Sequence, residues 1–196
     1  MRLSPLDWLT AARKQLEVGG PSAIKIEALA RDLGVSKGSF YWHFKDRTDL
    51  LWQLLSYWER GTDELIRLSS EESTPQDCLR RLFEELEKIG VTGESGIFSW
   101  AKQDEEVEAR VHAVEQKRLA YLCELFQQAG FVEEESRRRA EISYMAFLGY
   151  VYRGESATLP KFQRLGEDLL LLLMSPSSSI DGAGSSAPKK RRKPRT

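Results

Sequence analysis

Signals that begin and end helices recur along the whole sequence, whereas patterns typical of β-strands are almost absent. Residues 74–77 combine a threonine cap, a proline at the first helical position and a carboxylate in the first turn. Asp46 can cap another helix, and Gly34 and Gly90 stand where helices should end. The sequence therefore predicts an all-α fold of about nine helices. These helices are expected at residues 5–19, 26–33, 37–44, 47–68, 75–89, 97–102, 105–129, 133–153 and 160–174.

The charged residues are segregated along a chain whose formal net charge is only −1. Residues 1–50 carry 8 basic and 6 acidic side chains, residues 51–174 carry 15 and 23, and residues 175–196 carry 6 and 1. A mildly basic beginning, an acidic middle and a basic tail indicate different partners for different regions. The apolar fraction of 41% is sufficient for a packed core.

Several classes of protein are disfavoured. No run of 18 or more apolar residues occurs, and the first residues lack the apolar core of a signal peptide. The two cysteines, Cys78 and Cys123, and the two histidines, His43 and His112, have no metal-ligand spacing. No nucleophile stands out beside a titratable pair. We therefore expect a cytoplasmic protein that is not an enzyme, with no metal, no cofactor and no membrane partner.

Residues 26–51 (IEALARDLGVSKGSFYWHFKDRTDLL) have the pattern of a helix-turn-helix. Two short helices flank Gly34, which can supply the positive φ of a tight turn. The second helix opens with the small polar stretch Ser36–Ser39, which allows its first turn to approach base edges closely. Lys37 within that stretch can donate to guanine. A helical hairpin that merely packs is the alternative explanation for this pattern.

The run Phe40, Tyr41, Trp42, His43 and Phe44 favours DNA binding over mere packing. Four aromatic rings and a histidine in five residues exceed what a small three-helix core can bury. The two phenylalanines are four residues apart and should face the core. The tyrosine and the tryptophan then point elsewhere, and a base or phosphate surface would suit them.

The segment resembles the N-terminal domain of TetR-family transcriptional regulators. The residues that carry the resemblance are Leu33-Gly34-Val35, Ser36–Ser39, Phe40-Tyr41-Trp42-His43-Phe44, Arg47 and Leu50-Leu51. They cover about a quarter of the chain, and the remainder matches the family only in its helical layout. The resemblance implies a three-helix DNA-binding domain at residues 1–47, joined to a helical ligand-binding and dimerisation domain at residues 48–174.

The resemblance also implies which side chains contact double-stranded DNA. The expected DNA-binding residues are Lys25, Ser36, Lys37, Gly38, Ser39, Tyr41, Trp42, His43 and Arg47. Of these, Tyr41, His43 and Arg47 would contact phosphate. Lys25 departs from the common pattern because many members have a threonine cap there, and Arg47 departs because lysine is more common.

The last two predicted helices indicate a homodimer. Residues 133–153 are apolar on more than one face, and residues 169–174 are apolar all round. Two such helices from each of two subunits would form a four-helix interface, and the resemblance implies the same arrangement. A monomer in which these helices form a buried core is the alternative.

The resemblance further implies a cavity for a small-molecule effector among the middle helices. An aromatic lining would suit a flat or greasy molecule. The candidate lining residues are Trp58, Phe83, Phe98, Trp100, Tyr121, Tyr144 and Phe147. Each of them could equally be an ordinary core residue.

Residues 175–196 are expected to be a disordered tail. Its first part is rich in Ser and Gly, and residues 188–195 form a basic cluster. The cluster can be a flexible arm that adds phosphate affinity, an appended sequence like a nuclear-import signal, or a solubilising end. We favour the arm.

The predicted function is a ligand-responsive transcriptional repressor, which binds a palindromic operator as a homodimer and is released by a small molecule. Ligand binding would tilt the long fourth helix and change the separation of the two reading heads. An activator of the same family, or a helical ligand-binding or interaction protein that does not bind DNA, is the alternative. The resemblance implies a bacterial protein that is associated with the nucleoid when bound to its operator.

Overall fold

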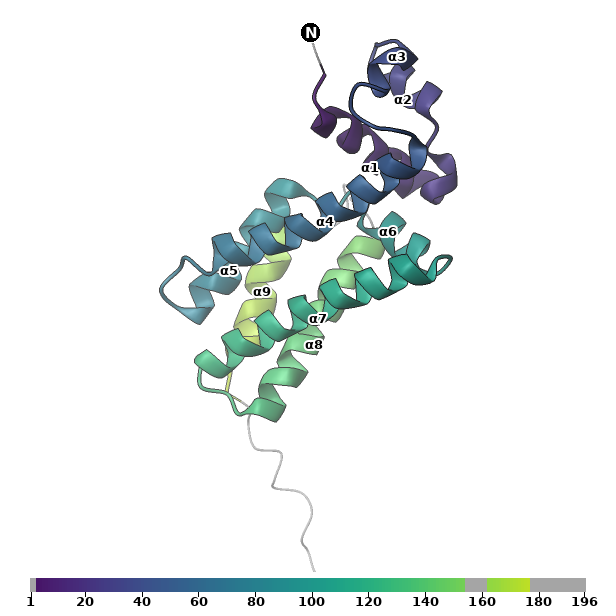
Figure 1. The fold of residues 1–196 in the computed structure, drawn as a ribbon. Coiled ribbons are helices and arrows are strands. Elements are labelled where there is room, and N and C mark those ends of the chain that lie inside the picture. The colour runs from purple at the N-terminus through teal and green to yellow at the C-terminus, as the bar shows by residue number, and fades with distance from the viewer. Residues whose placement is uncertain (1–2, 154–161, 177–196) are drawn as a thin grey trace, which may run out of the picture.

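The computed structural model describes residues 3–153 and 162–176, and the described residues form helices joined by turns and loops, without a strand among them (Figure 1). The helices are α1 (Pro5–Ala23), α2 (Ile26–Asp32), α3 (Lys37–Phe40), α4 (Arg47–Ser69), α5 (Pro75–Ile89), α6 (Glu94–Ala101), α7 (Glu105–Gln128), α8 (Glu133–Arg153) and α9 (Phe162–Met174). The predicted all-α fold is confirmed. The Ser/Gly-rich stretch from residue 177 and the basic cluster lie outside the described residues. No helix in the described ranges has the length and apolar character needed to cross a lipid bilayer.

The molecule has two parts joined by a long helix. Helices α1–α3 and the start of α4 form a small head, and the rest of α4 with α5–α9 forms a larger body, as Figure 1 shows. Their packed side chains form one continuous apolar cluster through both parts. The predicted domain boundary between residues 47 and 48 falls in the first turn of α4, so this helix is the covalent link between the two parts.

The expected helix caps are present in the structure. The Asp46 carboxylate accepts a hydrogen bond from the main-chain N–H of Asp49 at 2.8 Å, and the Thr74 hydroxyl accepts one from that of Asp77 at 3.1 Å. These bonds satisfy amides that have no partner inside the helix. The starts of α4 and α5 therefore lie where the sequence places them.

Three helix boundaries differ from the prediction by three residues or more. Helix α3 ends at Phe40 instead of residue 44, because the chain must turn to reach the extended conformation of the Asp46 cap. Helix α1 includes a break at Gly19–Gly20, the expected end, and then continues to Ala23. Helix α6 begins at Glu94, three residues before the expected start, because Gly93 in the left-handed region allows an earlier turn.

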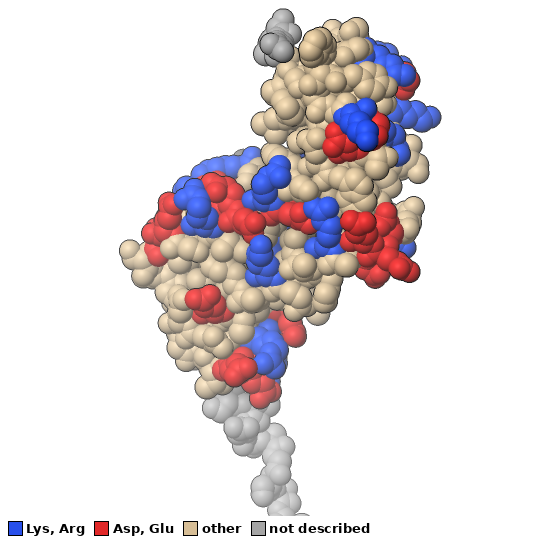
Figure 2. All heavy atoms as spheres, in the orientation of Figure 1, with Lys and Arg blue, Asp and Glu red and all other residues tan. Residues whose placement is uncertain are grey.

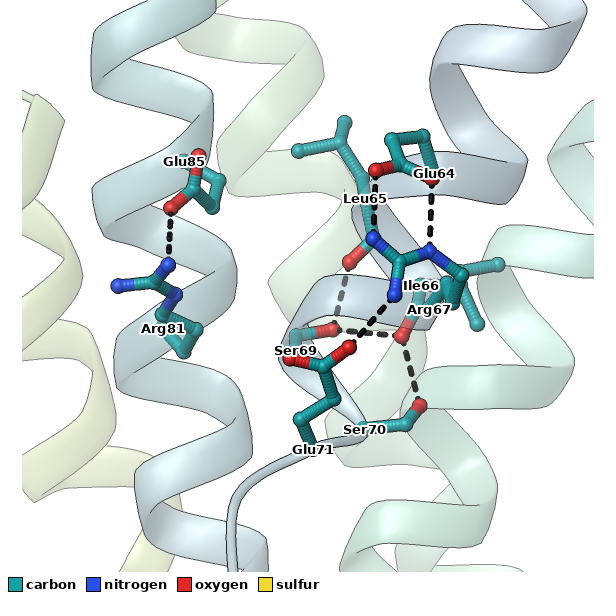
Figure 3. A network of polar contacts seen from close by, with 9 residues as sticks. All are labelled: Glu64, Leu65, Ile66, Arg67, Ser69, Ser70, Glu71, Arg81 and Glu85. Carbon is teal, nitrogen blue, oxygen red and sulfur yellow. Dashed lines mark hydrogen bonds and ion pairs between the residues drawn. The ribbon is translucent and has the colours of Figure 1, made fainter.

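Polar contacts stabilise the C-terminal end of α4. Figure 3 shows Arg67 between Glu64 and Glu71, at 2.7 and 2.5 Å, and the Ser69 hydroxyl donating to the Leu65 carbonyl at 2.8 Å. The same hydroxyl lies 2.8 Å from the hydroxyl of Tyr121 on α7. The end of α4 is thereby attached to α7 in the interior of the body.

Helix α6 joins the body to the head. The Glu17 carboxylate on α1 accepts hydrogen bonds from the Gly93 main-chain N–H and from the Ser95 hydroxyl, both at 2.7 Å. Gly96 packs so closely on α1 that a Cβ atom there would lie 2.6 Å from the Leu16 carbonyl oxygen. The glycine is therefore required by contact with main-chain atoms, which cannot move aside as a flexible side chain could.

A Gly96→Ala variant tests this close contact. We expect it to lower the free energy of unfolding by about 1–3 kcal/mol, because the added methyl group overpacks the junction of α1 and α6. The measurement is urea denaturation followed by circular dichroism.

The matched control is Gly61→Ala, because Gly61 is also inside a helix but a Cβ atom there would meet nothing within 4 Å. This control should raise the free energy of unfolding by about 0.5–1 kcal/mol. Equal effects of the two substitutions would show that α6 does not pack on α1 in this way.

Candidate nucleic-acid interface and ligand cavity

A cluster of three aromatic side chains fixes the position of α3. The rings of Trp8 and Phe40 meet edge to face with centroids 5.3 Å apart, and the rings of Phe40 and Phe44 stack at 5.2 Å. All three are essentially buried, at 0–1% exposure. The expectation that both phenylalanines face the core is confirmed. Since these two positions point inward, the intervening residues must point in other directions.

The residues between the two phenylalanines project from the head. Tyr41 is 53% exposed and Trp42 is 81% exposed, which is unusual for side chains of this size. Ser36, Lys37 and Gly38 at the start of α3 are exposed as well. Together with half-buried Ser39 and His43, these residues form what we call the reading surface, Ser36–His43. Seven of the predicted site residues lie in this stretch.

Lys37 is held by a residue that sequence reasoning missed. Its ammonium group donates to the carboxylate of Glu27 on α2, and both side chains are exposed. The Glu27 carboxylate raises the pKa of Lys37, and the Lys37 ammonium lowers the pKa of Glu27. The two residues are ten positions apart, so no helical spacing rule identifies the pair. In the free protein the expected base-contacting lysine is therefore engaged within the head.

The two remaining predicted site residues flank the reading surface. Lys25 is exposed at the start of α2 and provides no side-chain cap, as its lysine identity implies. The Arg47 guanidinium donates to the main-chain carbonyl of Ile24 at 2.7 Å and to that of Pro21. Arg47 therefore fastens the start of α4 to the α1–α2 connection, a structural role that its sequence pattern did not predict.

A cavity of about 540 Å³, including its mouth, lies in the body between α4, α5, α7 and α8. We call it the apolar cavity. Its lining residues are Thr62, Leu65, Ile66, Leu82, Phe83, Leu86, Arg118, Tyr121, Leu122, Ser143, Tyr144 and Phe147. Four of the aromatic residues named from the sequence are among them. Trp58 lines a neighbouring hollow instead, while Phe98 and Trp100 line neither and pack against Trp58 and Trp52, respectively.

Arg118 is the one charged residue among the residues that line the apolar cavity. Its guanidinium donates to the Glu94 carboxylate at 3.2 and 3.3 Å and to the Thr62 hydroxyl at 2.9 and 3.1 Å. It also lies 5.1 Å from the Trp58 ring and 5.3 Å from the Phe147 ring. Burial alone would lower the pKa of Arg118, but Glu94 raises it overall. The guanidinium thus remains a cation deep in the body.

The sequence contains a signal for Arg118 that the prediction did not use. The buried stripe of α7 includes Val111, Val114, Leu122 and Leu125. Arg118 lies four residues after Val114 and four before Leu122, a position in this stripe where an apolar residue is normal. A charged residue at a core position therefore indicates a functional role or a buried ion pair.

The first part of the chain matches a known protein family. The family of bacterial regulatory proteins called the tetR family matches residues 9–54, which include most of the aromatic cluster and the reading surface. The part of the chain from α1 to the second turn of α4 is therefore a TetR-type domain.

Curated relatives match this part of the chain. The HTH-type transcriptional regulator TtgR of Pseudomonas putida is 30% identical over 76 residues, which is 38% of this chain and 36% of that protein. A probable HTH-type transcriptional regulator of the same species, ArpR, matches to the same extent. The matched segment thus spans little more than a third of these relatives.

Solved structures match nearly the whole chain in fold. The fatty acid degradation regulator FadR from Bacillus halodurans has a TM-score of 0.64 at 16% identity, over 89% of this chain and 96% of that one. A transcriptional regulator from Aquifex aeolicus VF5 has a TM-score of 0.63 at 20% identity, over 86% and 96%. At this identity the likeness establishes the fold of a TetR-type domain joined to a helical body.

A Glu27→Gln variant tests whether the ion pair restrains Lys37. We expect the affinity for random-sequence duplex DNA to rise about two- to fivefold, because an exposed ion pair competes only weakly with phosphate for the Lys37 ammonium. The measurement is fluorescence anisotropy with a labelled duplex at fixed salt.

The matched control is Asp32→Asn, which removes the same charge from the same helix, α2. Asp32 accepts a hydrogen bond from Gln15 at 3.2 Å and lies 3.9 Å from Arg31, so its partners differ from those of Glu27. It should change the affinity less than Glu27→Gln does. If both variants bind DNA equally well, Glu27 acts only through net charge.

Proposed function

We propose that this protein is a homodimeric transcriptional regulator that binds a palindromic DNA operator and is released by a small-molecule effector. The observation that carries the proposal is the reading surface, where Tyr41 and Trp42 are exposed while the aromatic cluster holds the backbone behind them. Large exposed aromatics beside a lysine form a surface suited to bases and phosphates. Lys25, Ser36, Gly38, Ser39 and His43 complete the proposed contact surface.

The charge distribution supports this surface as the DNA-facing one. In the view of Figure 2, Lys and Arg side chains gather along one edge of the head, whereas the body shows acidic and basic groups interleaved. Residues 1–50 carry two more basic than acidic side chains, and residues 51–174 carry eight more acidic than basic ones. A polyanion is therefore favoured at the head and disfavoured at the body.

The dimer is proposed on the exposed apolar residues of α8 and α9. On α8, Ile142, Met145 and Tyr152 form an exposed stripe, and Met145 is 66% exposed. On α9, Leu171 and Leu172 are 72% and 74% exposed. Such a surface is costly in water and suits burial against the same surface of a second copy. Two heads are needed because a single one has little base-contact area.

The apolar cavity is the proposed effector site, and repression is the proposed default. The cavity is bounded by α4, which also begins in the head, so a ligand that prefers one position of α4 biases the separation of the two heads. A coupling of about 1–3 kcal/mol weakens operator binding roughly 5–150-fold. The same machinery serves an activator if the operator lies where binding recruits transcription.

A Leu172→Asp variant tests the dimer and its role in operator binding together. The palindrome is first obtained by selecting bound fragments from a random DNA pool. We expect the variant to be monomeric in sedimentation and to bind the palindrome no more tightly than a single half-site, because an unpaired carboxylate in an apolar interface is strongly unfavourable.

The control is Val18→Asp, which places the same charge on a similarly exposed apolar residue of α1. This variant should remain dimeric. A wild-type protein that enriches no sequence from the pool contradicts the proposed function. A Leu172→Asp dimer that still binds the palindrome as the wild type does contradicts only the proposed interface.

A further inference from the structure

We propose that the effector is an amphipathic anion. Its apolar part lies in the apolar cavity, and its carboxylate or similar anionic group replaces Glu94 as the ion-pair partner of Arg118. This inference deepens the proposed function and rests on it for the regulatory consequence. The chemical class of the ligand is inferred from the cavity alone.

The apolar cavity meets a second hollow at Arg118. The second hollow, which we call the junction cavity, measures about 940 Å³ with its mouth and lies between α1, α4, α5, α6 and α7. Arg118, Thr62, Leu65 and Leu86 line both cavities. One side of Arg118 thus faces an almost entirely apolar wall, and the other side faces polar groups. This division fits a molecule with an apolar body and a single polar end.

The charges around the junction cavity favour an anionic end. Its lining includes the three cations Arg13, Arg60 and Arg118 and the two anions Glu64 and Glu94. A cationic ligand would have to replace a guanidinium that already bonds Glu94 and lies close to two aromatic rings. An anionic ligand needs only to exchange one carboxylate for another on a guanidinium that stays in place.

Trp58 supplies a second donor beside Arg118. Trp58 is 7% exposed and lines the junction cavity, and the Arg118 guanidinium lies 5.1 Å from the centroid of its ring. Among the described residues its indole N–H has no acceptor. A buried donor without an acceptor is unfavourable, so an anionic group that came within reach of this N–H would supply the hydrogen bond that it lacks.

Displacement of Glu94 from Arg118 would change how the head is held against the body. Glu94 is in the first turn of α6, directly after Gly93, whose main-chain N–H is held by Glu17 of α1. While Arg118 holds Glu94, helix α6 is bonded to both α7 and α1. When a ligand carboxylate takes the place of Glu94, this residue can turn into the junction cavity, and the restraint on α6 from α7 is lost. The position of α1 relative to the body then depends on ligand.

The test compares three probes that share a ten-carbon chain: decanoate, 1-decanol and decylammonium. Binding to the full chain is measured by isothermal titration calorimetry. We expect decanoate to bind at least tenfold more tightly than the other two, because only the anion can replace the Glu94 carboxylate with another charge-assisted pair on Arg118. Equal binding of decanol, or tighter binding of decylammonium, overturns the proposed class of ligand, and this comparison requires no variant.

The role of Arg118 is tested by the double variant Arg118→Met with Glu94→Gln, in which no charge is left buried alone. Decanoate affinity should fall at least tenfold, and decanol affinity should change less than twofold. The matched control is Arg110→Met with Glu59→Gln. It removes a half-buried pair that joins α7 to α4, at 2.5 Å, and that lines neither cavity. Equal losses in the two double variants contradict a direct contact with Arg118.

The last measurement separates this inference from the proposed function. Operator affinity is determined with and without saturating decanoate. If decanoate weakens operator binding, both the ligand class and the proposed function are supported. If the protein binds its operator but does not bind decanoate more tightly than the other two probes, the proposed function stands and the ligand class is overturned. A protein that binds no operator but prefers decanoate through Arg118 retains the ligand class and loses the function.

Discussion

The packing of Phe40 and Phe44 against Trp8 determines what the head can present to a partner. The three buried rings hold the short α3 against α1, although a helix of this length has almost no stability of its own. Because two residues of the aromatic run are directed inward, Tyr41 and Trp42 are left on the outside. The exposed surface therefore has a fixed shape before any partner arrives. Such preorganisation lowers the entropic cost of binding.

The head is connected to the body in two ways, and both connections are needed for a bound ligand to change the position of the head. Helix α4 provides the covalent link, and α6 packs on α1 through Glu17 and Gly96. Arg118 contacts α4 through Thr62 and α6 through Glu94. One buried cation therefore touches both connections. A change at this single residue is placed to alter the two connections together.

The fold was predictable from local sequence features, because capping residues, prolines at helix starts and apolar periodicity act over a few residues. The start of α5 at Pro75 and the whole of α8 follow from such features. The early start of α6 was not predictable, since it depends on Glu17, which is 76 residues away from Gly93 in the sequence. Gly96 resembled a loop residue, yet its role is a close contact with α1.

The candidate site was predictable to the extent that it lies in one continuous stretch. Residues 36–43 are adjacent in the sequence and remain adjacent on the surface. The cavity was less predictable, because its walls come from four helices and depend on which aromatic residues face inward. Phe98 and Trp100 are as aromatic as Phe83 and Tyr121, but they pack into other parts of the core.

The central claim is that the reading surface binds DNA. It is tested most directly by a Lys37→Ala, Tyr41→Ala double variant on a palindrome selected with the wild-type protein, with Lys102→Ala at the end of α6 as the control. The account predicts that operator affinity falls by about 30-fold or more in the double variant, with thermal stability and dimerisation unchanged, because each of the two lost contacts contributes about 1–3 kcal/mol. An operator affinity equal to that of the wild type would show that DNA is bound by another part of the molecule.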